Sequence, residues 1–314
     1  MAPAPQYSDF VDVPANGRKP APVLKKRLAF RWYGGKFCHL DWLLPLLPVH
    51  GITHFCEPFG GSGAVILNRP PVDVETYNDL DGEVVNFFKV LRDQSEELIC
   101  ALSLTPFSRE EFELACMVTP DLSNIERARR FFIRAGQVRT GLAQTASLGR
   151  WANCVDTSRR GMSGAVSRWL NKIDGLDEIV QRLRRVQIEN RPAADIIRLY
   201  DSSGTLFYLD PPYPHDSRKD SKAYGYEMKN SDHEYLAEIL HSIKGKAAIS
   251  GYRGTLMDKL YKDWRRIDAP EKQAHSCKDL RQESLWVNFS EASDKQAHFS
   301  KQLRQESLRV NRTT

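Results

Sequence analysis

The 314-residue sequence contains only six cysteines, and their arrangement excludes two classes of protein. They show no pairing pattern and form no CxxC, so neither a disulfide scaffold nor a structural zinc site is expected. The pairs His54/Cys56 and His275/Cys277 are isolated. Because a closed zinc site needs more donors, we interpret them as packing or surface residues and expect no metal. Unpaired thiols fit a cytoplasmic location.

Long hydrophobic runs are also missing. The most apolar segment, Asp41–His50, is short and interrupted by Pro45 and Pro48, whereas a membrane helix needs about 20 apolar residues. The N-terminus is rich in Pro and Ala and lacks the apolar centre of a signal peptide. The sequence therefore predicts no membrane association and no secretion, and residues 1–26 are expected to form a flexible leader.

Positive charge is concentrated in one segment. The whole chain has a net charge of +5, but residues 121–191 contain 14 Lys/Arg against 7 Asp/Glu, and 13 of those 14 are arginine. Arginine suits bidentate contacts to phosphate or guanine, so this segment is a candidate for binding nucleic acid; the alternative is a solvated helical surface. The candidate contacts are Arg134, Arg139, Arg159, Arg160 and Arg168.

The remaining pattern predicts an α/β protein with an insertion. Helices are expected from Ala64, over residues 84–91, and after Ser231, which matches a capping box with Glu234. Between the two α/β parts, helical stretches at 126–135 and 178–186 flank a polar segment. Strands are expected at 52–56, 72–77, 205–209, 247–250 and 284–289.

A glycine turn follows the first expected strand, in Glu57–Gly63 (EPFGGSG). It fails the GxGxxG pattern because Ile66 stands at the last glycine position, and no GxxxxGK[ST] occurs. Asp79 comes 16 residues after Gly63, at the end of the next strand, where a carboxylate can accept hydrogen bonds from ribose hydroxyls. Together these features indicate an adenosine ligand without a diphosphate, and S-adenosylmethionine is the obvious candidate.

The segment Asp210-Pro211-Pro212-Tyr213 follows the strand expected at 205–209. The two prolines have no N–H and stiffen the turn, so the Asp210 carboxylate and the carbonyls remain as acceptors beside an aromatic ring. An exocyclic amine on a flat base needs such acceptors and a ring on which to stack. The alternative is a rigid loop with a helix-capping aspartate.

These motifs, in this order, resemble those of Dam-like adenine-N6 DNA methyltransferases. The resemblance is carried by Arg31–Lys36 (RWYGGK), Glu57–Gly63, Asn78-Asp79 and Asp210–Tyr213 (DPPY), and it extends over roughly residues 30–289. It implies a Rossmann-like, seven-stranded S-adenosylmethionine-dependent methyltransferase sheet with an inserted, mostly helical target-recognition region. It also implies double-stranded DNA as partner and a flipped-out adenine as substrate, in either a solitary enzyme or the partner of a cognate restriction endonuclease.

The resemblance implies a role for each matching residue. Asp210, Pro211, Pro212 and Tyr213 would form the catalytic loop. The cofactor would be bound by Trp32, Lys36, Phe59, Gly61, Gly63, Asp79 and Asp210, with Lys36 near its carboxylate. No cysteine follows a proline, which argues against attack at a cytosine ring carbon. Methylation of RNA or of cytosine N4, and a non-catalytic DNA-binding module, remain as alternatives.

An internal repeat marks the C-terminus. Lys272–Asn288 matches Lys295–Asn311 at 13 of 17 positions, but Arg309 stands in the second copy where the first has Trp286. One duplication is too little for a solenoid, so we interpret the second copy as an exposed tail. The expected organisation is a leader at 1–26, a catalytic domain at 27–94 and 192–290, an inserted recognition region at 95–191, and the duplicated tail at 291–314.

Overall fold

The computed structural model describes residues 26–140, 142–214, 227–270 and 282–290, and these form the α/β architecture that the sequence predicts. A seven-stranded sheet has the order β5-β2-β1-β6-β7-β9-β8, in which only β9 runs antiparallel to its neighbours. The strands are β1 (His54–Glu57), β2 (Val74–Asn78), β5 (Val186–Glu189), β6 (Thr205–Leu209), β7 (Lys246–Tyr252), β8 (Arg265–Asp268) and β9 (Glu283–Val287).

The strand order reverses at β1, which pairs with β2 on one side and β6 on the other. Every residue of β1, β6 and β9 is buried, as expected for central strands of a sheet covered on both faces. In sheets of this kind, ligands bind outside the carboxyl ends of the strands where the order reverses. The fold therefore directs attention to the residues that follow β1, β2 and β6.

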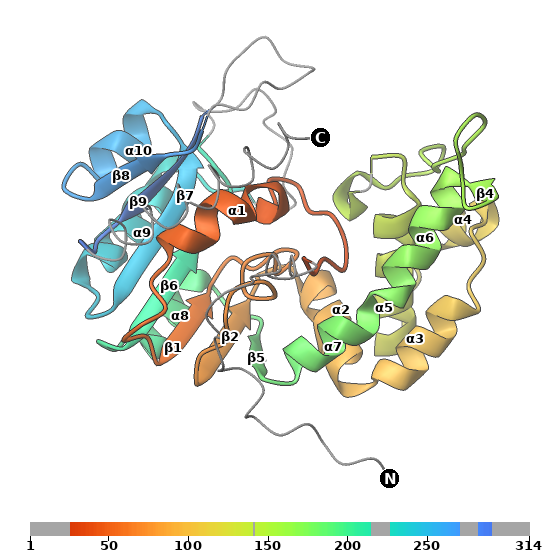
Figure 1. Ribbon diagram of the computed structural model, residues 1–314, viewed down its shortest axis with the longest axis horizontal. Coiled ribbons are helices and arrows are strands. Elements are labelled where there is room, and N and C mark those ends of the chain that lie inside the picture. The colour runs from red at the N-terminus through yellow and green to blue at the C-terminus, as the bar shows by residue number, and fades with distance from the viewer. Residues whose placement is uncertain (1–25, 141, 215–226, 271–281, 291–314) are drawn as a thin grey trace, which may run out of the picture.

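Helices cover the sheet and also form a separate group beyond it. Figure 1 shows the sheet with α8, α9 and α10 on one side of the molecule and α3 to α7 on the other, with α2 adjoining the second group. The helices are α1 (Leu40–Leu43), α2 (Gly82–Asp93), α3 (Ser95–Ser103), α4 (Arg109–Cys116), α5 (Asn124–Gln137), α6 (Gly164–Asp174), α7 (Leu176–Leu183), α8 (Ala193–Tyr200), α9 (Asn230–Ser242) and α10 (Thr255–Leu260). Short 3-10 turns η2 (Lys36–His39), η3 (Leu44–Leu46) and η4 (Ala143–Thr145) and the hairpin β3 (Ser158–Arg159)–β4 (Met162–Ser163) complete the fold.

The inserted helices share a core with the sheet domain. Phe87 on α2 stacks on Phe132 of α5 with a centroid distance of 5.5 Å, and Phe30 meets Phe131 edge-to-face at 5.0 Å. Tyr77 at the end of β2 contacts Phe88 in the same cluster. Because these large side chains are buried together, the helical region is attached to the catalytic domain by apolar packing and not only by its chain connections.

Two local predictions are wrong. Ala64–Asn68 forms consecutive turns rather than a helix. The side-chain amide of Asn68 donates to the Ala64 carbonyl, and after Arg69 come Pro70 and Pro71, which have no N–H groups to continue a helix. Helix α9 begins at Asn230, so the expected capping box of Ser231 and Glu234 lies inside the helix. The Asp232 carboxylate instead accepts from the Lys229 N–H at 2.7 Å.

The boundary of the insertion also needs a correction. Val186–Glu189 is strand β5, paired in parallel with β2, so the end of the expected insertion at 95–191 lies in the main sheet, and the helix expected at 178–186 ends at Leu183. Three expected segments lie outside the described residues: the leader up to residue 25, most of the first copy of the repeat, and the tail at 291–314. Within the part that the structure describes, no helix has the length and apolar character to cross a bilayer.

Candidate active site

Three neighbouring parallel strands deliver acidic or amide side chains to one edge of the sheet. Glu57 ends β1, Asn78 ends β2 and is followed by Asp79, and Asp210 follows β6. Between them lies a cavity of about 370 Å³. Its lining comprises Trp32, Tyr33, Gly35, Lys36, Glu57, Pro58, Phe59, Gly60, Gly61, Ser62, Ala64, Asn78, Asp79, Leu80, Asp81, Arg191, Ala193, Asp210, Pro212, Glu227 and Met228.

The glycine turn forms one wall of this cavity because its backbone packs against two aromatic rings. A Cβ atom at Gly60 would overlap the Tyr77 ring, and one at Gly61 would lie 2.6 Å from Trp32 Cδ1. Gly61 also has φ +49°, a left-handed conformation that favours glycine. The Tyr77 hydroxyl donates to the Gly61 carbonyl at 2.7 Å. The turn is thus held in a shape that leaves room for a ligand directly against the backbone.

Asp79 is fixed beside this turn. One of its carboxylate oxygens accepts from the Gly61 N–H at 2.7 Å and the other from the Asp81 N–H at 2.8 Å. Burial raises the pKa of Asp79 to about 6, although these backbone bonds oppose the shift. A carboxylate oxygen can accept more than one hydrogen bond, so both oxygens can still receive ligand hydroxyls.

The opposite wall holds a buried ionic cluster. Lys36 is 3% exposed, and its Nζ lies 2.7 Å from Asp210 Oδ1 and 3.4 Å from Glu283 Oε1. Burial disfavours the ammonium form, but the Asp210 and Glu283 carboxylates outweigh it, so the pKa of Lys36 is raised. Burial and Glu283 raise the pKa of Asp210, against the lowering effect of Lys36. The Tyr213 hydroxyl donates to Glu283 Oε1.

The structure brings most of the residues expected from the sequence to this cavity, but not all. Those in its lining are Trp32, Lys36, Phe59, Gly61, Asp79, Asp210 and Pro212. Gly63, Pro211 and Tyr213 do not line it: Gly63 closes the turn by donating to the Gly60 carbonyl at 2.8 Å, and the Tyr213 ring packs edge-to-face on Tyr252. Lys36, expected near a cofactor carboxylate, faces the protein's own Asp210 and Glu283.

Two acidic residues were not singled out from the sequence. Glu57 is buried in the cavity wall, where its Oε2 accepts from the Ile66 N–H at 2.9 Å, and burial raises its pKa well above the usual range. The sequence offered one indication of a role for Glu57, namely its position directly before the glycine turn. Glu283 opens β9, 73 residues after Asp210, and no local pattern in the sequence connects it to the site.

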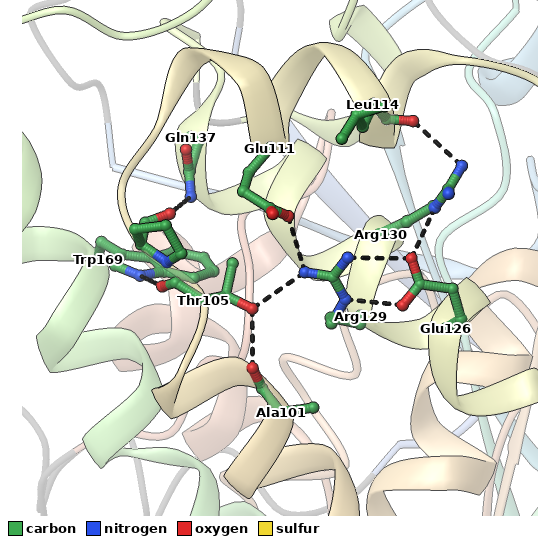
Figure 2. Close-up of polar contacts among 10 residues, drawn as sticks. Ala101, Thr105, Glu111, Leu114, Glu126, Arg129, Arg130, Gln137 and Trp169 are labelled. Atoms are coloured by element: carbon green, nitrogen blue, oxygen red, sulfur yellow. Dashed lines mark hydrogen bonds and ion pairs between the residues drawn. The ribbon is translucent and has the colours of Figure 1, made fainter.

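The arginine-rich segment divides into two groups, and the first is directed at the protein itself. Figure 2 shows Arg129 of α5 held by Glu126, by Glu111 and by the Thr105 hydroxyl, and Arg130 held by Glu126 and the Leu114 carbonyl. Arg134, an expected DNA contact, donates to the Ala115 carbonyl at 2.8 Å and lies 3.4 Å from Glu83. Part of the positive charge of this segment is therefore neutralised inside the helical region.

The second group is exposed. Arg139, Arg159, Arg160 and Arg168 all have exposed side chains, on the segment after α5, the β3–β4 hairpin and α6. Arg160 occupies a left-handed conformation with φ +55°, and Arg139 and Arg160 donate only to the neutral side chains of Asn153 and Asn171. Their charges are available to an anionic partner.

No three His, Cys, Asp or Glu side chains in the described ranges are arranged to hold a metal ion. His54, half of one isolated pair, contacts Thr76 Oγ1 at 2.9 Å and packs edge-to-face on Tyr200. This confirms that His54 is a packing residue. The cysteines that the structure describes are all free thiols.

Comparison with known proteins shows the family to which this chain belongs. The type II methyltransferase M1.LlaDCHI of Lactococcus lactis subsp. cremoris is 24% identical over 258 residues, covering 74% of this chain and 84% of that protein. A DNA N-6-adenine-methyltransferase of Escherichia phage P1 is 35% identical over 81 residues, which are 26% of this chain and 10% of that protein. Residues 32–280 match a family described as D12 class N6 adenine-specific DNA methyltransferase.

That match extends over the glycine turn, Asp79, the segment 210–213 and the helical region between them. It decides among the alternatives that the motifs left open, in favour of adenine in DNA over cytosine, RNA or binding alone. The chain is a site-specific adenine DNA methyltransferase, and it belongs to the D12 class N6 adenine-specific DNA methyltransferase family.

Proposed function

We propose that the enzyme takes its methyl group from S-adenosylmethionine and transfers it to the N6 amine of an adenine flipped out of double-stranded DNA. The observation that carries this proposal is a single cavity that joins the glycine turn, Asp79 and Asp210. These three features come from β1, β2 and β6, the strands at the point where the sheet order reverses.

The residues of the cavity fit this cofactor. A sulfonium is a cation, and the lining carries five carboxyl groups, those of Glu57, Asp79, Asp81, Asp210 and Glu227. Asp79 would accept the ribose hydroxyls, while Trp32 and Phe59 provide apolar surface beside the glycine turn. S-adenosylmethionine, when bound, supplies an electrophilic methyl group, so the protein contributes position and electrostatics.

The corner formed by residues 210–213 would prepare the adenine for attack. The amino lone pair of adenine is delocalised into the ring and is a poor nucleophile. Asp210 and the Pro211 carbonyl would accept the two N6 hydrogens, which draws the nitrogen towards tetrahedral geometry. The bond from N6 to the methyl carbon would form as the methyl–sulfur bond breaks, and N6 would lose one of its two protons to Asp210. Because these acceptors are fixed before the reaction, they stabilise the positive charge that develops on nitrogen without reorganising.

Tyr213 would stack on the flipped base, a step that compensates part of the few kcal/mol that unstacking costs. Its ring is 4% exposed and packed on Tyr252, with the centroids 4.8 Å apart. Stacking therefore requires the base to reach the ring at the corner beyond Pro212, or the ring to turn towards the cavity.

The exposed arginines would bind the DNA. Within the described residues, these four side chains, Arg139, Arg159, Arg160 and Arg168, are exposed and form no ion pair with a carboxylate. Arginine contacts to phosphate would position a duplex over the active site. Arg134 is directed inward and contributes to the fold.

The setting of the enzyme is a further part of the proposal. The relative from Lactococcus lactis is named a type II methyltransferase, which supports a pairing with a restriction endonuclease. The free thiols and the DNA substrate support a cytoplasmic location.

Label transfer tests the proposal. Tritium from methyl-labelled S-adenosylmethionine should enter duplex DNA and be recovered as N6-methyl-2′-deoxyadenosine. Asp210→Ala should abolish transfer and largely retain cofactor binding, because the glycine turn and Asp79 remain. Wild-type rates in Asp210→Ala, or label in another base, would refute the assignment. Sequencing of methylated sites in expressing cells would identify the recognised sequence.

A further inference from the structure

Glu283 stands at the one antiparallel strand of the sheet, yet its side chain reaches the catalytic corner. It is the first residue of β9 and pairs in register with Tyr252 of β7. Its side chain is 6% exposed, and the same oxygen, Oε1, accepts the Tyr213 hydroxyl and lies 3.4 Å from Lys36 Nζ. A buried carboxylate at this place is costly unless it has partners, and these two contacts supply a hydroxyl donor and an ammonium to Oε1.

The cluster has two carboxylates for one ammonium. Lys36 is closer to Asp210, at 2.7 Å, than to Glu283, at 3.4 Å, and its Nζ lies 5.0 Å from the centre of the Tyr213 ring. An amine that donates to Asp210 shares this carboxylate with Lys36, so the attraction of Asp210 for the ammonium weakens when the substrate binds. Lys36 Nζ also donates to the Gly34 carbonyl at 2.8 Å, but without a second carboxylate the buried ammonium would lack a full counter-charge, a state that costs several kcal/mol.

We propose that Glu283 is a positioning residue: it anchors the Tyr213 side chain and retains Lys36 when Asp210 turns to its substrate. Strand β9 thereby holds a loop that comes from β6, two strands away in the sheet. This inference rests on the proposed role of Asp210 as the acceptor for the adenine amine.

The inference has a consequence for pH dependence. Removing the Glu283 charge lowers the pKa of Asp210, because that charge helps to raise it. At saturating cofactor, the acid limb of kcat/KM for DNA, where Asp210 must be ionised, should then move to lower pH. The groups that face Asp210 or its lysine partner are Lys36 of η2, Glu57 of β1, Tyr208 of β6, Tyr213 of the corner, Tyr252 of β7 and Glu283 of β9.

Two variants separate the contacts of Glu283. Glu283→Gln keeps an oxygen for the Tyr213 hydroxyl but removes the charge that holds Lys36. Tyr213→Phe keeps the ring and that charge but removes the hydroxyl. We expect kcat to fall about 10-fold or more in Glu283→Gln, the size of a lost charge-assisted hydrogen bond, with little change in cofactor Kd. We also expect its acid limb to shift to lower pH.

Glu75→Gln is the matched control. Glu75 lies in β2, is equally buried, and pairs with Arg182, away from the cluster. This variant should lose stability but keep the wild-type pH profile. Glu283→Gln with wild-type kcat and an unshifted acid limb would overturn the inference. If Glu283→Gln does not fold, Tyr213→Phe decides: a reduced kcat supports the anchoring role, and a wild-type kcat overturns it.

The two levels of proposal fail differently. A wild-type enzyme that transfers no label to adenine would overturn the proposed function and this inference together. An active wild-type enzyme whose Glu283→Gln variant behaves normally would overturn only the role of Glu283.

Discussion

Directly after β2, the Asp79 carboxyl is half-buried, and desolvation raises its pKa to about 6, although hydrogen bonds from the Gly61 and Asp81 N–H groups act in the opposite direction. Ionised, it is an acceptor for both ribose hydroxyls; protonated, one oxygen carries a hydrogen. The bound state thus favours the ionised form. Cofactor affinity should therefore be constant above about pH 7 and fall by up to about tenfold per pH unit well below pH 6.

Isothermal titration with S-adenosylmethionine between pH 5 and 8 measures this effect. Asp79→Asn should bind more weakly at neutral pH and show no decline between pH 7 and 5, because the titrating group is gone. If the wild-type affinity were the same at pH 5 and pH 7, Asp79 would not be the acceptor for the ribose.

On the scale of single elements, β9 carries both a site residue and a core residue. Trp286 is 1% exposed, and a Cβ at Gly251 of β7 would lie 3.1 Å from its ring. The second copy of the repeat has Arg309 at the matching position. Trp286→Arg should lower the free energy of unfolding by at least about 3 kcal/mol, because it removes a buried ring and buries an unpaired guanidinium.

Urea denaturation followed by Trp fluorescence and circular dichroism gives the transition midpoint. Trp286→Phe, which keeps an apolar ring, is the control and should lose less stability than Trp286→Arg. An arginine variant with the wild-type midpoint would mean that the ring contributes nothing to the strand, or that another segment takes its place.

Strands with a continuous or alternating apolar pattern could be predicted from the sequence, and two strands without such a pattern could not. Thr205–Leu209 was predicted with its exact bounds as β6, since five buried residues in a row leave one interpretation. Strands β5 (VQIE) and β8 (RRID) have mixed patterns and depend on pairing with their neighbours. The turn at 64–68 depends on hydrogen bonds of Asn68 with Ala64 and Arg27, which no local pattern reveals.

The same distinction applies to the site. The glycine turn, Asp79 and Asp210 could be found because each follows a recognisable strand, and the cavity joins them as the parallel topology requires. Glu283 depends on β9 entering the sheet beside β7, a long-range pairing with no signal in the sequence. The number of arginines in residues 121–191 also overstated the charge available to DNA, because a total does not show which guanidinium groups are already paired within the protein.

For the whole molecule, the division of the arginines separates folding from DNA binding. Arg129 connects α5 to Glu111 of α4 and to Thr105 after α3 (Figure 2). Arg159 and Arg168, in contrast, are exposed, on the β3–β4 hairpin and on α6. The first kind should determine whether the helical region is stable. The second kind should determine how strongly the enzyme responds to salt, because phosphate contacts release counterions.

Fluorescence anisotropy with duplex DNA at several salt concentrations tests this division. Arg159→Ala and Arg168→Ala should each reduce the slope of log K against log[salt] by about one and leave the unfolding midpoint unchanged. Arg129→Ala, in the same helical region, should lower the free energy of unfolding by about 1–2 kcal/mol, a discounted value because Arg129 is partly exposed, and keep the slope. A folded Arg129→Ala enzyme with a reduced slope would place the DNA on a different face, and so would Arg159→Ala and Arg168→Ala variants with an unchanged slope. The reason is that an arginine in contact with a phosphate must contribute to the salt dependence of binding.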